Sequence, residues 1–344
     1  MAQRDIIVMG ASAGGIEAFR EIIRAFPRGF PASVFIVLHI PSDSPSRLHF
    51  ILARDTELPV TPARDHAPIK RGHIYVAPPD HHLVLHQDHM RVVRGPRENR
   101  HRPAIDPLFR SAARSFGSRV IGVLLSGLLD DGTNGLQIIH ARGGVSVVQD
   151  PRDAEYSTMP HNAVEFDSPD FVLPVEEIGP QLVQLTDEAV RSKGNGKPVP
   201  TELNEEVGVA EMKMDALEAE RQGDPSVFSC PECQGVLWEV KDGELVRYRC
   251  RVGHAYSSES LLSSKSEELE AALWSALRAL EESAAISRRM ADRAKKNGHK
   301  LSHGKLTEHA KEQQDQAAML RTMLVRKGTV GAHEEVEAGT GTEG

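Results

Sequence analysis

The sequence contains three cysteines among its 344 residues, and all of them lie between positions 230 and 250. So few cysteines, gathered in one short stretch, exclude a disulfide framework and fit a reducing, cytoplasmic location. Long apolar runs are missing as well, since no stretch approaches the ~20 residues that cross a bilayer. The first residues lead at once into the apolar run Ile6–Val8 and lack the pattern of a signal peptide. We therefore expect a cytoplasmic protein with no membrane insertion.

An excess of positive charge is also absent. The formal net charge is −8, which gives no general attraction to nucleic acid or to an anionic membrane surface. Nucleic acid is therefore not expected as a partner. The chain is 40% hydrophobic, which is enough to bury a core, and its length suits about two domains.

Apolar runs alternate with amphipathic segments over the first 190 residues. A strand over 5–10 precedes a helix over 15–26, whose apolar residues share one face. Residues 34–38 form a fully apolar run, as in parallel strands that are covered on both faces. The alternation predicts a doubly wound α/β fold with a largely parallel sheet, interrupted by a β-hairpin near 82–94. Further strands are predicted over 73–77, 82–86, 90–94, 120–125 and 145–149, and further helices over 44–54, 106–116 and 133–142.

The composition changes near residue 191, which marks the end of a first domain over 1–190. The breaker-rich stretch Arg191–Pro200 and a charged, helical segment over about 202–222 predict a linker region, 191–226. Beyond it we predict three further regions, which are a cysteine module over 227–257, an α-helical hairpin or coiled coil over 258–327, and a disordered tail over 328–344.

Two stretches of the C-terminal region carry apolar residues at alternating spacings of four and three. This spacing is typical of helices that pack along a seam, and residues 295–299 provide a turn between the two stretches. An intramolecular hairpin satisfies the pattern, and so does self-association or docking of a helical partner through 258–327. The seam positions are Leu269, Leu273, Ala276 and Leu280, then Leu306, Ala310, Gln313, Ala317, Leu320 and Leu324.

The turn after the first strand has the form Gly-x-Ser-x-Gly, with Ser12 at its centre. Such a turn can expose a nucleophilic serine between a strand and a helix, and the helix start offers N–H groups to an oxyanion. A phosphate-cradling loop and an ordinary tight turn are the alternatives. The nucleotide-binding alternative is weakened because the middle glycine of a Gly-x-Gly-x-x-Gly pattern would fall at Ser12.

A base and an acid for such a serine are available at the ends of other strands. His39 ends the second apolar run, and the carboxyl ends of parallel strands meet at one edge of a sheet. A histidine that merely caps the strand is the alternative. The strand over 120–125 runs into a turn that contains Asp130 and Asp131, and either carboxylate could orient a histidine. One of the two could equally cap the following helix, and spacing alone does not choose between them.

Five motifs follow one another along this part of the chain: Val8–Gly15, Leu38–Pro41, Gly72–His82, Asn99–Asp106 and Leu125–Gly132. In order and spacing, they resemble the catalytic domain of the chemotaxis protein-glutamate methylesterase family (CheB), over residues 5 to about 187. In that family the serine of the first motif is the nucleophile, the histidine of the second is the base, and the aspartate before the last glycine is the third member. The resemblance therefore implies that Ser12, His39 and Asp131 are catalytic.

The resemblance implies hydrolysis of glutamate γ-methyl esters on chemoreceptor-type proteins, in chemotaxis or a related signalling pathway. It also implies that backbone N–H groups around Ala13, Leu128 and Gly132 bind the oxyanion, and that no cofactor takes part in catalysis. Members of the family also deamidate receptor glutamines. The family commonly has threonine where this chain has Ala13 and methionine where it has Leu128, so a different rate or substrate preference is a further hypothesis.

Arg100 and Arg102 flank His101, and they either contact the acidic helices of a receptor or brace local loops. The receiver domain of the family has no counterpart before the strand at residue 5, so we expect regulation without a fused receiver. The rival hypothesis is a signalling adaptor that uses the hydrolase fold and the C-terminal regions for partner binding.

The cysteine module has the spacing of a zinc ribbon. Cys230 and Cys233 form one close pair, and Cys250 and His254 form a second pair after sixteen intervening residues. Tetrahedral Zn²⁺ takes four such ligands, which leaves no open position for catalysis. A redox Cys-x-x-Cys is the rival, but it leaves Cys250 and His254 unexplained. We therefore predict a structural zinc ion, with a β-hairpin between the two pairs.

Overall fold

The computed structural model describes residues 3–41, 46–190, 198–213, 223–242 and 245–330. The chain forms two compact units, Met1–Leu262 and Ser263–Gly344. The predicted methylesterase region and the predicted cysteine module both lie in the first unit. No helix within the described ranges is long and apolar enough to cross a membrane.

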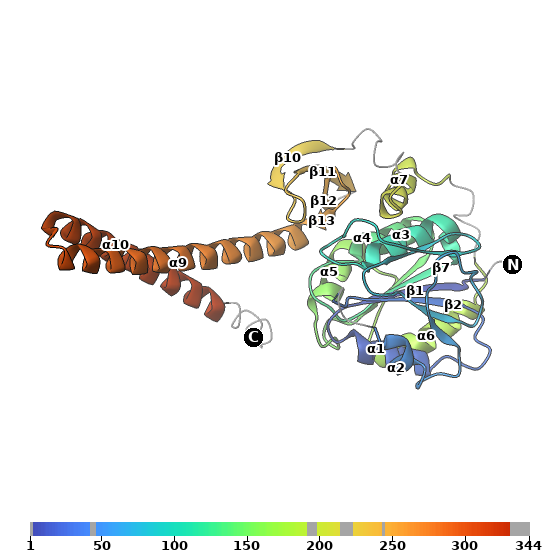
Figure 1. The fold of residues 1–344 in the computed structure, drawn as a ribbon. Coiled ribbons are helices and arrows are strands. Elements are labelled where there is room, and N and C mark those ends of the chain that lie inside the picture. Colours follow the sequence, from blue (N-terminus) through green and yellow to red (C-terminus); the bar gives the residue numbers. More distant parts are fainter. Residues whose placement is uncertain (1–2, 42–45, 191–197, 214–222, 243–244, 331–344) are drawn as a thin grey trace, which may run out of the picture. The chain divides into compact units, whose positions relative to one another are not determined.

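A seven-stranded sheet forms the centre of the first unit (Figure 1), with the strand order β3-β4-β2-β1-β7-β8-β9. Every neighbouring pair in it is parallel. The predicted largely parallel sheet is therefore confirmed. The central strands are buried on both faces, which explains their unbroken apolar runs. The strands are β1 (Ile6–Ala11), β2 (Ser33–Leu38), β3 (Val60–Pro62), β4 (Ile74–Val76), β7 (Val120–Leu124), β8 (Val145–Gln149) and β9 (Phe171–Leu173).

Helices cover both faces of this sheet, as the doubly wound fold requires (Figure 1). Three of them pack with Ile7, Met9 and Ile36 in the core of one face: α1 (Gly15–Arg24), α2 (Leu48–Leu52) and α6 (Val175–Asp187). Three pack with Val8 and Phe35 in the core of the other face: α3 (Ile105–Phe116), α4 (Thr133–Ala141) and α5 (Thr158–Asp167). The predicted hairpin is also present, as β5 (His82–Leu85) paired antiparallel with β6 (Met90–Val93).

Some elements differ from the sequence-based prediction. Strands β3 and β9 were not predicted; they have only three residues each and are only partly buried. Helices α5 and α6 were also not predicted. Helix α2 is shorter than the predicted 44–54, of which residues 44 and 45 lie outside the described part. In the linker, α7 (Thr201–Ala210) covers the first half of the predicted helical segment, and residues 191–197 and 214–222 lie outside the described part.

A second, four-stranded antiparallel sheet follows in the same unit, in the order β10-β11-β12-β13. It contains the predicted hairpin of the cysteine module, formed by β11 and β12. The Gly243–Glu244 turn of that hairpin lies outside the described residues. The strands are β10 (Asp224–Ser229), β11 (Val236–Asp242), β12 (Leu245–Cys250) and β13 (Ala255–Ser257).

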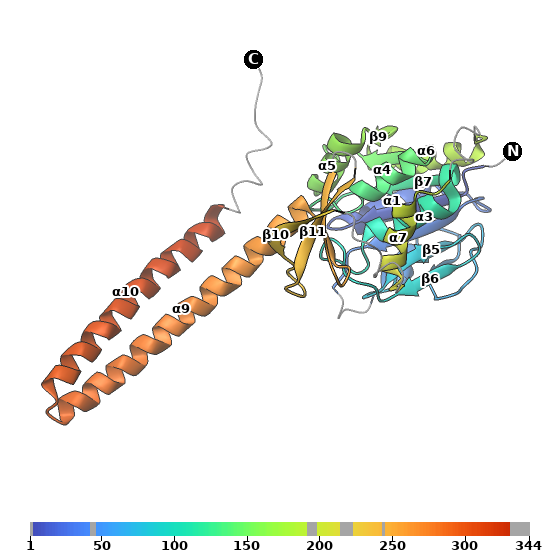
Figure 2. The ribbon, with the colours of Figure 1, turned by 90° about the horizontal axis from the view of Figure 1, so that it is seen from above.

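The second unit consists of two long helices that run antiparallel (Figure 2). They are α9 (Ser258–Lys296), whose first residues belong to the first unit, and α10 (Lys300–Val330). Their buried seam contains Leu273, Leu277, Leu280, Ala317, Leu320 and Leu324. The predicted seam was wrong at Leu269, which is half exposed, and Leu277 takes the place predicted for the exposed Ala276. The predicted disordered tail falls largely on 331–344, outside the described residues.

Candidate active site

The turn after β1 presents Ser12 at the carboxyl edge of the large sheet. Ser12 N–H donates to the Ser126 carbonyl at 3.0 Å, which ties this turn to the one after β7. Gly14 has φ 73° at the start of α1, a left-handed conformation that favours glycine. Gly127 lies so close that an added Cβ would stand 3.0 Å from Ser12 Cβ and 2.7 Å from Met159 Sδ. The two glycines thus leave room for the Ser12 side chain between the two turns.

His39 and Asp131 lie where strand-end reasoning predicted, after β2 and in the turn that follows β7. His39 Nε2 lies 2.8 Å from an Asp131 carboxylate oxygen, and both side chains are almost fully buried. The other ring nitrogen of His39, Nδ1, is buried and has no hydrogen-bond partner in the described part of the chain. Asp130, the alternative that spacing left open, does not face His39 but accepts a hydrogen bond from Ser257 at 2.6 Å.

The Asp131 carboxylate is held by the start of α3 as well as by His39. It accepts N–H groups of Ile105 at 2.6 Å and Asp106 at 3.3 Å, and the Asn99 amide at 3.0 Å. Burial alone would raise the pKa of Asp131, but His39 and these N–H donors hold it well below the usual range of a carboxyl. The neighbouring Asp106 shows the opposite effect, because burial and the charge of Asp131 raise its pKa to about 8. At neutral pH the charge of this carboxyl pair therefore lies on Asp131.

His101 lines the same cleft, although the sequence analysis did not name it as a site residue. Its ring stacks on that of His39, with centroids 3.6 Å apart and planes inclined by 8°. Burial, then the proximity of His39, lowers the pKa of His101 to about 3. A neutral ring therefore covers His39, which restricts the orientation of the imidazole without adding a charge.

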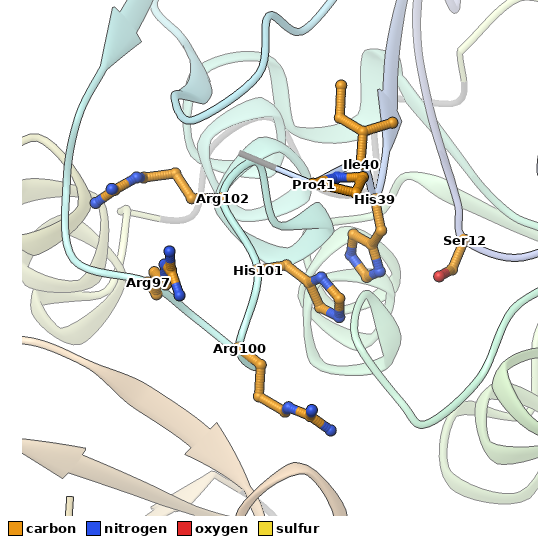
Figure 3. Close-up of a pocket in the computed structure, with 8 residues that line it drawn as sticks. All are labelled: Ser12, His39, Ile40, Pro41, Arg97, Arg100, His101 and Arg102. Atoms are coloured by element: carbon orange, nitrogen blue, oxygen red, sulfur yellow. The ribbon is translucent and has the colours of Figure 1, made fainter. Parts of the chain in front are cut away.

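A cleft of about 580 Å³ opens in front of these residues. Figure 3 shows the Ser12 hydroxyl directed into the same cleft as the His39 and His101 rings. Three arginines form its opposite side: Arg97, Arg100 and Arg102. Apolar contacts come from Ile40 and Pro41. The cleft therefore joins a serine hydroxyl, an imidazole and a side that carries three guanidinium groups.

The two arginines predicted from the sequence differ in their surroundings. Arg102 donates to Asp80 at 2.6 Å and to the Gly95 carbonyl at 2.7 Å, so its guanidinium braces the loop it belongs to. Arg100 has a left-handed backbone with φ 74° and lines the cleft. Arg97, which the sequence did not single out, pairs with Glu232 of the cysteine module at 3.1 Å.

The predicted oxyanion residues belong to the two turns that the Ser12–Ser126 hydrogen bond joins. Ala13 follows Ser12 directly, and its carbonyl accepts a hydrogen bond from the Ser126 hydroxyl at 2.8 Å. Leu128 is half exposed in the turn that also contains Asp131. Gly132 ends that turn at φ 97° and caps α4. Because Ser12 N–H already bonds to Ser126, an oxyanion would have to be bound by the N–H groups that remain in these two turns.

Comparison with known proteins shows to which family the chain belongs. The sequence model of the family described as CheB methylesterase matches residues 7–182, about half of the chain. The chain belongs to the CheB methylesterase family. Its members are carboxylic ester hydrolases, so the family, the fold class and the enzyme class predicted from the motifs are confirmed.

The relatives share the methylesterase region of the chain. A Leptospira interrogans protein, provisionally named protein-glutamate methylesterase/protein-glutamine glutaminase, is 39% identical over 182 residues, which make up 53% of this chain and 94% of that protein. An Anaeromyxobacter dehalogenans protein-glutamate methylesterase/protein-glutamine glutaminase 2 is 39% identical over 54% of each chain. The crystal structure of the Thermotoga maritima CheB methylesterase catalytic domain is covered completely by 54% of this chain, with 32% identity and a TM-score of 0.52. The cysteine module and the helical hairpin lie outside the region that matches the CheB family model.

Within the CheB fold of this chain, Asp130 gives a testable pH dependence. Burial raises its pKa to about 7, against about 4 in an unfolded chain. Between these two values the folded state holds a proton that the unfolded state has lost, so the free energy of unfolding falls as the pH rises from about 4 to about 7. We expect Asp130→Asn to remove this fall. Between pH 5 and pH 8 the wild type should lose about 2–3 kcal/mol of unfolding free energy that the variant keeps. Urea unfolding at both pH values measures it, and equal pH dependence in the two proteins would contradict it.

The cysteine module brings its four predicted ligands together. Ligand atoms of Cys230, Cys233, Cys250 and His254 all lie within 4.8 Å of one another. The Sγ atoms of Cys233 and Cys250 are 3.6 Å apart, and His254 Nδ1 lies 3.7 Å from Cys230 Sγ and 3.5 Å from Cys250 Sγ. Zinc–sulfur bonds of about 2.3 Å place sulfurs at the corners of a tetrahedron with edges of about 3.7 Å. The four side chains therefore fit a tetrahedral metal ion.

Proposed function

We propose that the protein hydrolyses glutamate γ-methyl esters on chemoreceptor-type proteins, with Ser12 as nucleophile, His39 as base and Asp131 as the supporting carboxylate. The observation that carries the proposal is the buried His39–Asp131 pair at the edge of the cleft into which the Ser12 hydroxyl points. Family membership supports the reaction class, and the names of the relatives support the substrate.

The hydrogen bond between His39 and Asp131 supports a different role for each nitrogen of His39 in this mechanism. Nε2–H donates to Asp131, which fixes the tautomer and leaves the lone pair of Nδ1 to take the proton of Ser12 Oγ. As Oγ attacks the ester carbonyl, the ionised Asp131 stabilises the imidazolium that forms. His39 then returns the proton to the departing methoxide, and water releases the glutamyl group from Ser12 by the same base.

The cationic side of the cleft supports a protein substrate with acidic surroundings. Receptor helices carry the ester among free glutamates, and arginines hold carboxylates well because their guanidinium groups donate paired hydrogen bonds. We assign this contact to Arg100, with Arg102 as the brace that positions the loop. The same site can act on a glutamine side chain, with ammonia in place of methanol as the leaving group, in line with the glutaminase names of the relatives.

Methanol release from a methylated receptor cytoplasmic fragment tests the proposal. We expect the wild-type chain to release methanol, and mass spectrometry to find a loss of 14 Da at each hydrolysed residue, the difference between a methyl ester and an acid. A folded protein that binds the fragment without releasing methanol would replace the enzyme proposal by the adaptor hypothesis.

We also propose that the Cys₃His cluster holds a structural zinc ion. Protein purified without chelator should contain about one zinc per chain, and Cys233→Ser should reduce this content strongly because it removes one of the four ligands. Glu232→Gln is the matched control within the same knuckle and should keep its zinc. A wild-type protein without zinc and with three titratable thiols would contradict the proposal.

A further inference from the structure

The cysteine module contacts the catalytic part of the first unit along one segment of the cleft wall, residues 97–99. Ala255 N–H donates to the Arg97 carbonyl at 3.2 Å, and Asn99 N–H donates to the Ala255 carbonyl at 2.9 Å. Glu98 thus pairs in parallel with Ala255, at the start of β13. The segment that precedes His101 is therefore held to the module by an isolated β-bridge and its flanking hydrogen bonds.

Buried charged side chains also link the cysteine module to the catalytic part of the first unit. Glu206 of α7 accepts hydrogen bonds from Arg249 at 2.5 Å and Arg247 at 3.2 Å, both on β12. The fully buried Arg110 of α3 lies 3.7 Å from the same carboxylate and also pairs with Glu98. Removing one partner of such a buried pair is costly, because it leaves an uncompensated charge. These buried pairs therefore oppose separation of the module from the catalytic part.

The side chain of Asn99 spans this contact and reaches the proposed triad. Its Nδ2 donates to Asp131 at 3.0 Å and to Asp106 at 3.2 Å. Its Oδ1 accepts the N–H of Ser257 at 2.9 Å and the hydroxyl of Ser260 at 3.1 Å. Asn99 is only 6% exposed and has φ 46°, a left-handed conformation that asparagine tolerates better than most residues.

The two sides of the amide fix its orientation. The Asp131 carboxylate on one side accepts a hydrogen bond only from the NH₂ group, and Ser257 N–H on the other side donates only to the carbonyl oxygen. A turned amide would place its oxygen against the Asp131 carboxylate and its NH₂ group against Ser257 N–H. The module therefore reinforces the rotamer in which Asn99 donates to Asp131.

We infer that Asn99 is a positioning residue of the esterase site and that β13 and the start of α9 act through it as part of that site. This rests on the proposed function, because it assigns the C-terminal module a role in the same reaction. Asn99 donates to Asp131, the carboxylate that pairs with His39, and Ser257 and Ser260 hold Asn99.

Asn99→Gly tests the first link. Glycine keeps the left-handed backbone without strain and removes only the amide. We expect kcat on the methylated receptor fragment to fall about 10–100-fold while KM changes less than about 3-fold, because Asn99 does not face the cleft and acts on the chemical step. The downfield ¹H NMR signal of the proton on His39 Nε2 should shift or broaden in this variant. Unchanged kcat and an unchanged signal would overturn the inference.

Ser260→Ala tests the second link, with Ser258→Ala as its matched control. Both serines lie in the first turn of α9, but the Ser258 hydroxyl bonds to the Val246 carbonyl and does not reach Asn99. We expect Ser260→Ala to lower kcat about 3–10-fold and to shift the His39 signal, because Ser257 N–H still holds the amide. Ser258→Ala should match the wild type in both.

The two measurements separate this inference from the proposed function. A wild type without turnover would reject the methylesterase proposal, and the NMR comparison of Asn99→Gly, Ser260→Ala and Ser258→Ala would still decide the coupling. Turnover that falls in Asn99→Gly but is identical in the two serine variants would overturn the role of the module. Should Asn99→Gly fail to fold, Ser260→Ala carries the test.

Discussion

Ser12→Ala is expected to lower methanol release by about 10⁴–10⁶-fold, because the covalent route through the acyl-enzyme disappears when its nucleophile is removed. The alanine fits the turn, since the Ser12 side chain lies at the open cleft and its backbone N–H to Ser126 is kept. Folding and binding of the receptor fragment should therefore be unchanged. Methanol measured over a long incubation, with the catalyst at high concentration, is needed to detect the residual rate.

Ser115→Ala is a suitable control for this change. Ser115 lies near the end of α3 and is not among the residues that line the cleft. Its hydroxyl donates to the Leu85 carbonyl at 2.8 Å, so the rate should stay within about 2-fold of the wild type. If Ser12→Ala released methanol at a rate close to that of the wild type, the nucleophile would have to be another group, and the proposed mechanism would fail at its first step.

Asp131→Asn is expected to have the second largest effect, a fall in kcat of about 10³–10⁴-fold. Asp131 accepts hydrogen bonds from four donors, which belong to His39, Asn99, Ile105 and Asp106. An asparagine has two N–H donors of its own, so at least one of them must face a donor of the site. The variant also lacks the charge that stabilises the imidazolium of His39, so both the orientation and the basicity of the ring are lost.

Asp130→Asn is the matched comparison, one residue earlier in the same turn. Burial already raises the pKa of Asp130 to about 7, so an amide at this position resembles the protonated form that is partly populated at neutral pH. We expect its kcat to stay within about 3-fold of the wild type at pH 7. Equal losses in the two variants would show that the turn as a whole, and not the Asp131 carboxylate, supports the reaction.

Much of the fold could be predicted because the central strands lie under helices on both faces. Burial on both faces demands unbroken apolar runs, and β1, β2, β7 and β8 all contain them. The edge strands β3 and β9 needed no such run, since each pairs on one side and is partly exposed. Strand ends also predicted that His39 and one of two aspartates would lie near Ser12, because all three follow parallel strands of one sheet.

The rest of the candidate site depends on contacts that leave no local pattern. His101 stacks on His39 from a loop without regular structure. The hydrogen bonds of Asn99 to Ser257 and Ser260 join residues 158 and 161 positions apart, and neither serine differs from an ordinary helix-capping residue in the sequence. Spacing alone did not choose between Asp130 and Asp131; the family resemblance chose Asp131, and N–H groups at the start of α3 hold its carboxylate beside His39.

The contact between Asn99 and the start of α9 also has a consequence for a chain that is still being synthesised. When the ribosome has completed the turn at Gly132, the segments with Ser12, His39 and Asp131 have all been made, but residues 133–260 have not. At roughly 5–20 residues per second, that interval lasts on the order of ten seconds. During it Asn99 lacks both partners at Ser257 and Ser260, so the segments of the proposed triad are without this support until the module has been made. Esterase activity would thus reach its full value only after the module has emerged and folded.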